Sequence, residues 1–125
     1  MITPLTSNLS DSTVVSRDFP MESYLADLEK VVNMDSGTEY LDGCHQVADF
    51  FVARMKGIGL SVKRLATEET GRPMLIGTNC TEEDTYDLLF VGHMDTVFPE
   101  GTAVSRPFRL DREEGMAYGA GTIDM

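Results

Sequence analysis

Apolar residues recur every three or four positions in the first half of the chain, which is the spacing of one helix face. The first run predicts a helix over 21–32, beginning after Pro20 and ending near Asn33, with its face made by Met21, Tyr24, Leu25, Leu28, Val31 and Val32. In the second run, Ser36 and Glu39 form a capping-box pattern that predicts a helix start. Its apolar face consists of Tyr40, Cys44, Val47, Ala48, Phe51, Val52 and Met55, and Gly57 and Gly59 predict its end.

The second half of the chain has strand-like patterns instead. Residues 60–65 alternate between apolar and polar, and residues 74–77 form a short apolar run. Residues 88–91 are continuously apolar, which predicts a strand covered on both faces. Residues 109–118 read as a hairpin with its turn at 111–115. Helices followed by strands predict an α/β layered fold.

Composition limits the possible partners and compartment. The 125 residues carry a net charge of −11, which argues against nucleic acid because phosphate binding needs clustered Lys and Arg. Cys44 and Cys80 lack a metal-type spacing and are expected to be reduced thiols. Without a secretory signal pattern or a run of about 18 apolar residues, no membrane partner is expected and the expected compartment is cytoplasmic. Residues 1–18, rich in Ser and Thr, are expected to be a flexible arm before a folded part at 19–125.

His93 and Asp95 follow the predicted 88–91 strand directly. The carboxyl end of a strand is the usual position of a site in an open α/β sheet. Alternate residues of an extended backbone share a face, so the Asp95 carboxylate could hold the His93 imidazole as it binds a metal ion. The pattern is short, and two polar loop residues remain the alternative reading.

Gly119 and Gly121 precede Asp124 and allow a tight turn that delivers its carboxylate to a crowded place. Two carboxylate oxygens can contact two cations. An ordinary Gly-rich connection ending in a cap is the alternative. No Gly-Lys-Ser/Thr follows, so this is not a phosphate loop.

Together these motifs resemble a known superfamily. The 88–97 run, Arg106-Pro107-Phe108 and the 118–125 run are similar, in order, to motifs of glutamate carboxypeptidases, acetylornithine deacetylases and succinyl-diaminopimelate desuccinylases, whose zinc ions are co-catalytic. The resemblance implies the N-terminal portion of a three-layer α/β/α catalytic domain, truncated, with the rest of that domain and a dimerisation domain absent.

The resemblance also implies roles for individual residues. His93 and Asp124 would be metal ligands, with Asp124 bridging two Zn²⁺ ions (or Co²⁺ or Mn²⁺), and Asp95 would be the catalytic residue that orients His93. His93 and Asp124 are therefore expected to converge in space. The general-base glutamate and the remaining ligands would lie beyond Met125. Glu113 and Glu114 are expected in a solvated turn, and His45 in a structural or surface position.

The implied activity is hydrolysis of an amide bond next to a free carboxylate, in a small peptide with glutamyl or related residues. The sequence around His93 and the lack of Trp favour the carboxypeptidases. An N-acyl-amino-acid deacylase and a non-catalytic binding relative are the alternatives. The resemblance implies that the full-length protein is a homodimer, and that the 125-residue chain alone is inactive.

Overall fold

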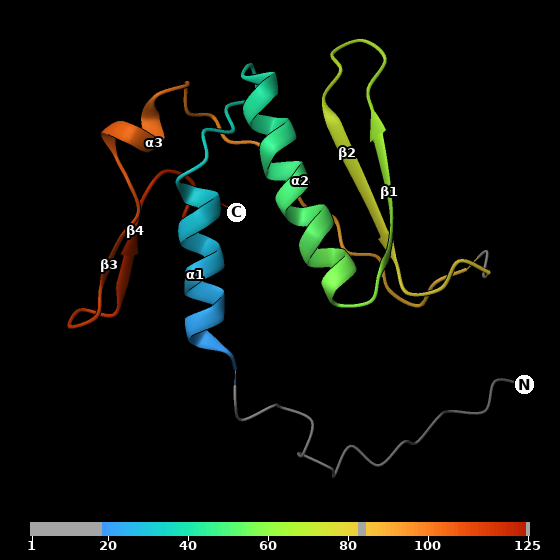
Figure 1. Ribbon diagram of the computed structural model, residues 1–125, viewed down its shortest axis with the longest axis horizontal. Helices are drawn as coiled ribbons and strands as arrows, with labels where there is room; N and C mark the ends of the chain where they lie inside the picture. The colour runs from blue at the N-terminus through green and yellow to red at the C-terminus, as the bar shows by residue number, and fades with distance from the viewer. Residues whose placement is uncertain (1–18, 83–84, 125) are drawn as a thin grey trace, which may run out of the picture.

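The computed structural model describes residues 19–82 and 85–124, and contains helices and short antiparallel strands (Figure 1). The expected arm at 1–18 lies outside the described residues. The helices are α1 (Met21–Val32), α2 (Leu41–Gly57) and α3 (Thr102–Ser105), and the strands are β1 (Ser61–Ala66), β2 (Pro73–Thr78), β3 (Arg109–Asp111) and β4 (Met116–Tyr118). The predicted α/β class is confirmed, while the three-layer arrangement stays an expectation.

Both predicted helices are present, but the start of α2 differs from the sequence prediction. The N-cap of α2 is Tyr40, with no side-chain cap hydrogen bond, so the predicted capping box at Ser36 and Glu39 is wrong. Ser36 is buried, and its hydroxyl has no hydrogen-bond partner within the described residues. Glu39 instead pairs with Arg72 at 2.9 Å. The reason is tertiary: the backbone of Ser36 and Thr38 bonds to Thr96 in a distant segment, and no side chain caps the helix.

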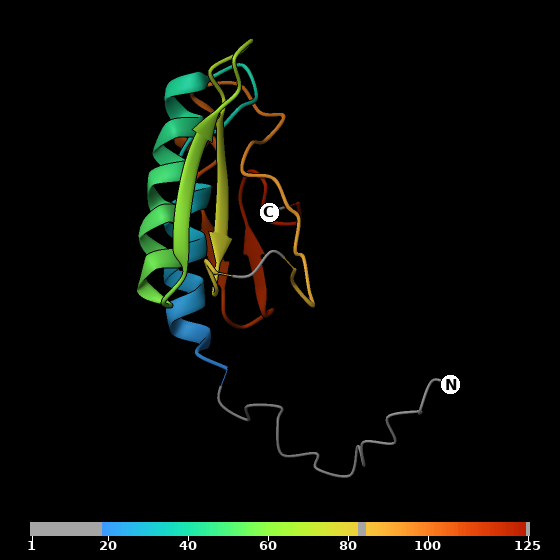
Figure 2. The same cartoon turned by 90° about the vertical axis from the view of Figure 1, so that its right-hand side faces the viewer.

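The β1–β2 hairpin lies against α2. The two strands pair antiparallel, in a register that runs from Ser61 opposite Thr78 to Ala66 opposite Pro73. In Figure 2 α2 covers one face of this hairpin. The strands at 60–65 and 74–77 predicted from the sequence are therefore confirmed.

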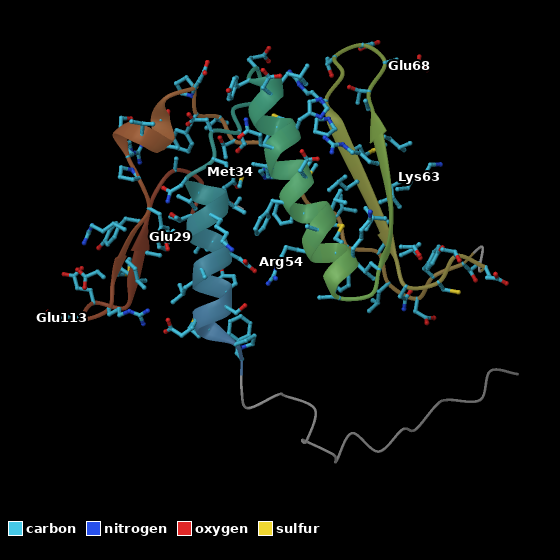
Figure 3. The ribbon with its side chains drawn as sticks, viewed as in Figure 1. Glu29, Met34, Arg54, Lys63, Glu68 and Glu113 are labelled. Atoms are coloured by element: carbon cyan, nitrogen blue, oxygen red, sulfur yellow. The ribbon has the colours of Figure 1, made fainter. Side chains whose placement is uncertain are left out.

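The second predicted hairpin is also confirmed. Strands β3 and β4 pair antiparallel, with Arg109 opposite Tyr118. The Asp111 carboxylate accepts hydrogen bonds from the backbone N–H groups of Glu113 and Glu114, at 3.1 and 3.0 Å, and so holds the turn. Figure 3 shows Glu113 at the outer end of this hairpin. Both glutamates thus lie in an exposed turn, as expected.

The predicted buried strand at 88–91 is wrong. Leu88, Leu89, Phe90 and Val91 are 76–88% exposed, and this part of the chain belongs to neither sheet. A strand obtains its hydrogen bonds and its burial from neighbouring strands. None of the strands at 19–82 or 85–124 pairs with this run (Figure 2), and its apolar side chains are therefore exposed.

The buried core is small and centres on the facing ends of α1 and α2. Its largest fully buried side chains are Val32 and Val47, and its other apolar members are Val31, Cys44, Ala48, Ala103 and Ala120.

No helix in the described parts of the chain is long and apolar enough to cross a bilayer.

Cys44 is the one core residue with a titratable group, and burial, followed by the negative charge of Asp95, raises the pKa of its thiol. The thiolate is the reactive form, so at pH 8 we expect iodoacetamide to modify Cys44 more slowly than the less buried Cys80. The folded state favours the protonated thiol, so the free energy of unfolding should fall as pH rises above the ordinary thiol pKa. Mass spectrometry of peptides from a time course measures the rates at which iodoacetamide modifies Cys44 and Cys80. Equal rates at the two cysteines would contradict the burial of Cys44.

Candidate metal centre

His93 lies in the extended segment that follows the exposed apolar run. Its ring Nδ1 is 2.9 Å from the backbone carbonyl oxygen of Asp95 and 3.6 Å from Asp95 Oδ1. Both oxygens can only accept, so in the neutral ring Nδ1 carries the hydrogen and Nε2 carries the free lone pair. The sequence predicted the carboxylate of Asp95 as the partner; the nearer partner is its backbone carbonyl.

The Asp95 carboxylate is held from its other side by Thr38. Thr38 Oγ1 donates to Asp95 Oδ2 at 2.7 Å and lies 3.1 Å from the Thr96 carbonyl oxygen. A hydroxyl has a single hydrogen to donate, and the shorter contact to a charged acceptor is the stronger bond. Asp95 is therefore fixed between the α1–α2 connection and the His93 ring.

Asp124 reaches the same place from the Gly-rich turn at 119–124. Gly119 packs so closely on α1 that an added Cβ would come within 2.3 Å of Val32 Cγ1. The Asp124 backbone N–H donates to the Gly121 carbonyl at 3.1 Å, which closes the turn. As the sequence predicted, the glycines permit a close-packed turn that ends in a carboxylate.

His93 and Asp124 converge as expected, although 31 positions separate them. His93 Nε2 is 3.7 Å from Asp124 Oδ2, and the two side chains are 52% and 77% exposed. Zinc bonds are about 2.0–2.1 Å to imidazole nitrogen and about 2.0–2.2 Å to carboxylate oxygen. One ion can therefore bind both atoms, so the donors fit a zinc ion. Within 19–82 and 85–124, however, no group of three His, Cys, Asp or Glu side chains could hold a metal ion.

The segment from Ser36 to Thr38 supports this site, a role that the sequence motifs did not indicate. Gly37 and Thr96 form a parallel bridge: Thr96 N donates to Ser36 O at 2.8 Å, and Thr38 N donates to Thr96 O at 2.9 Å. An added Cβ at Gly37 would lie 2.2 Å from the Phe98 carbonyl oxygen, so the two segments touch through their backbones. The sequence signal for this segment is a short polar turn between two helices, and the same residues also match a capping-box pattern.

Two more long-range contacts fix this connection. The Asp35 carboxylate accepts from the backbone N–H groups of Gly101 and Ala103, at 2.7 and 2.8 Å. Arg72 Nε donates to the Thr38 carbonyl at 3.1 Å. The connection between α1 and α2 is thereby tied to the β1–β2 hairpin and to the region of α3.

A surface depression of about 370 Å³ begins at Thr38, beside Asp95. It is lined by Thr38, Glu39, Tyr40, Val97, Phe98, Pro99 and Glu100. The charge of Glu100 is the main cause of a raised pKa at Tyr40, so the phenol stays protonated over a wider pH range. The depression thus combines apolar contact area with a hydrogen-bond donor.

Sequence comparison with known proteins agrees with this geometry. Residues 89–125, which contain His93, Asp95 and Asp124, match the family described as "Peptidase family M20/M25/M40". This match and the two relatives described next support the resemblance of the chain to the M20/M25/M40 peptidase superfamily.

Two relatives within this superfamily have curated names. Carboxypeptidase G2 of Pseudomonas sp. (strain RS-16) is 33% identical over 101 residues, which are 78% of this chain and 23% of that protein. Acetylornithine deacetylase of Proteus mirabilis (strain HI4320) is 40% identical over 73 residues, which are 57% of this chain and 18% of that protein. The matched region thus covers less than a quarter of either relative.

Proposed function

We propose that this chain forms part of a zinc-dependent hydrolase that cleaves an amide or peptide bond next to a free carboxylate, with carboxypeptidase-like specificity for glutamyl or related substrates. The observation that carries the proposal is the approach of His93 Nε2 to Asp124 Oδ2 at 3.7 Å, inside the segment that matches the superfamily. The similarity to carboxypeptidase G2 supports a carboxypeptidase-type reaction, and the glutamyl preference rests on the sequence around His93.

The described residues have separate tasks in this proposal. His93 Nε2 and the Asp124 carboxylate would hold zinc, and the second Asp124 oxygen would be free for a second ion. Zinc bound in such a site lowers the pKa of a coordinated water and polarises a carbonyl. Asp95 keeps the hydrogen of the His93 ring on Nδ1, which leaves Nε2 directed at Asp124. Co²⁺ or Mn²⁺ would suit the same nitrogen and oxygen donors.

A second candidate is an N-acyl-amino-acid deacylase. The identity of 40% with acetylornithine deacetylase favours it, and the same metal ligands would serve both reactions. A panel of glutamyl peptides and N-acyl amino acids separates the two, because the preferred substrate has the higher kcat/KM. A relative that uses the fold only for binding would cleave neither class.

The 125-residue chain is expected to bind Zn²⁺ weakly at His93 and to hydrolyse no amide. It offers two ligands in the described residues, whereas a stable zinc site has three or four. Added Zn²⁺ should shift the NMR signals of the His93 ring, and elemental analysis after dialysis should find far less than one zinc per chain. Asp124→Asn should weaken the His93 response.

His45 is the internal control for this titration. Its Nδ1 lies 2.7 Å from Arg64 Nη2, and a cationic neighbour disfavours a metal ion. Zinc retained stoichiometrically through dialysis would contradict the two-ligand count. An unchanged His93 ring at saturating Zn²⁺ would contradict the site itself.

The proposal includes a cytoplasmic location and a homodimeric full-length protein. Cys44 and Cys80 are both free thiols, which suits a reducing compartment. Cell fractionation and size-exclusion chromatography with light scattering test these two parts.

A further inference from the structure

We propose that Thr38 is a positioning residue of the candidate metal centre, acting on His93 through Asp95. The inference rests on the proposed function for the metal, but the contacts that carry it belong to the chain itself. Thr38 Oγ1 donates to Asp95 Oδ2 at 2.7 Å, and the other oxygen of that carboxylate, Oδ1, faces His93 Nδ1 at 3.6 Å. The hydroxyl therefore determines which way the carboxylate presents itself to the ring.

The backbone around Thr38 is fixed strongly enough to make this hydroxyl a reference point. Its N–H donates to the Thr96 carbonyl at 2.9 Å, and its own carbonyl accepts from Arg72 Nε at 3.1 Å. Gly37, one residue earlier, touches the backbone of Phe98 with no room for a Cβ. The Thr38 backbone is therefore held in place. The hydroxyl of Thr38 sets the orientation of the Asp95 carboxylate, and not the reverse.

The consequence for His93 is a preferred tautomer. With Asp95 Oδ1 and the Asp95 carbonyl both facing Nδ1, the ring hydrogen stays on Nδ1 and the lone pair of Nε2 points towards Asp124. Without the Thr38 hydroxyl the carboxylate can rotate towards solvent, because its side chain is already 36% exposed. Nδ1 then keeps the Asp95 carbonyl as its acceptor, while Asp124 Oδ2 still faces Nε2 at 3.7 Å, so the Nε2–H tautomer gains population and places a hydrogen where a metal ion would bind.

The test uses the metal-free 125-residue chain labelled with ¹⁵N, at a pH where both histidines are neutral. Long-range ¹H–¹⁵N correlation spectra report the tautomer of each ring. We expect the Nδ1–H form of His93 to predominate in the wild type and in Thr38→Ser, and to lose population to the Nε2–H form in Thr38→Val. Thr70→Val is the matched control, because Thr70 lies in the exposed turn between β1 and β2 and its hydroxyl bonds only within that turn.

A Zn²⁺ titration of the same samples gives the second readout. We expect Thr38→Val to raise the Kd for Zn²⁺ at His93 about 10-fold, at the lower end of the range for residues that orient ligands. Thr38→Ser should restore the wild-type Kd. If Thr38→Val fails to fold, as judged by the His45 signals, Thr38→Ala replaces it.

The outcomes separate the inference from the proposed function. A wild-type tautomer population in a folded Thr38→Val chain overturns the inference, as does a tautomer change with an unaltered Kd. If the wild-type chain shows no Zn²⁺ response at His93, the proposed function fails, the role of Thr38 in metal binding fails with it, and the tautomer measurement still decides whether Thr38 controls Asp95 and His93.

Discussion

Replacement of His93 by alanine is expected to lower amide hydrolysis by the proposed zinc enzyme about 10³-fold while leaving its fold intact. The side chain is half exposed and its short hydrogen bond is to one backbone carbonyl, so the free energy of unfolding should change by less than about 0.5 kcal/mol. Loss of the metal ion removes several kcal/mol of transition-state stabilisation. At about 1.36 kcal/mol per tenfold, a loss of roughly 4 kcal/mol lowers kcat/KM about 10³-fold.

The measurement is kcat/KM on the glutamyl and N-acyl panel, with zinc content determined on the same samples. Asp95→Asn should lower kcat/KM about 10–100-fold, because it alters a group that orients a metal ligand. His45→Ala is the matched control and should keep near-normal turnover, since His45 lies on α2 and its ring pairs with Arg64. Near-normal turnover by His93→Ala would falsify the zinc mechanism.

Gly43→Ala is expected to destabilise the chain by about 3 kcal/mol or more. Gly43 is buried in the first turn of α2, and an added Cβ would come within 1.9 Å of the Asp35 carbonyl oxygen and 2.5 Å of the Tyr40 ring. The nearest of these atoms belongs to the backbone, so relief requires α2 to move away from the α1–α2 connection. The same connection carries Thr38, so the geometry at Asp95 should change as well.

Gly57→Ala is the matched control because it makes the same substitution in the same helix. A Cβ at Gly57 meets nothing within 4 Å. Alanine has the higher helix propensity, so this variant should be unchanged or up to about 0.5–1 kcal/mol more stable. Urea unfolding followed by circular dichroism measures both. A Gly43→Ala chain as stable as Gly57→Ala would show that α2 does not pack against Asp35 as described.

Three features that depend on neighbouring residues agree with the prediction from the sequence. The helix periodicity of 21–32, the end of α2 at Gly57 and the hairpin turn after Asp111 depend on residues within a few positions of one another. The chemistry of the candidate site was also visible, because His93, Asp95 and Asp124 stand in short motifs that resemble a known superfamily. Their convergence could be expected only from that resemblance.

Tertiary structure decided the features that depend on distant neighbours. The sequence of 88–91 has the composition of a buried strand, yet burial and pairing come from other strands, and the described chain provides none at that place. Ser36 and Glu39 have the residues of a capping box, but backbone bonds to Thr96 and the pairing of Glu39 with Arg72 use these residues elsewhere. The sequence shows Thr38 in a short polar turn but not its role, because its hydroxyl matters only where a segment 57 positions away brings Asp95 beside it. Residue types and local spacing thus set the helices, the turns and the available ligands, whereas contacts between distant segments set which of those groups meet.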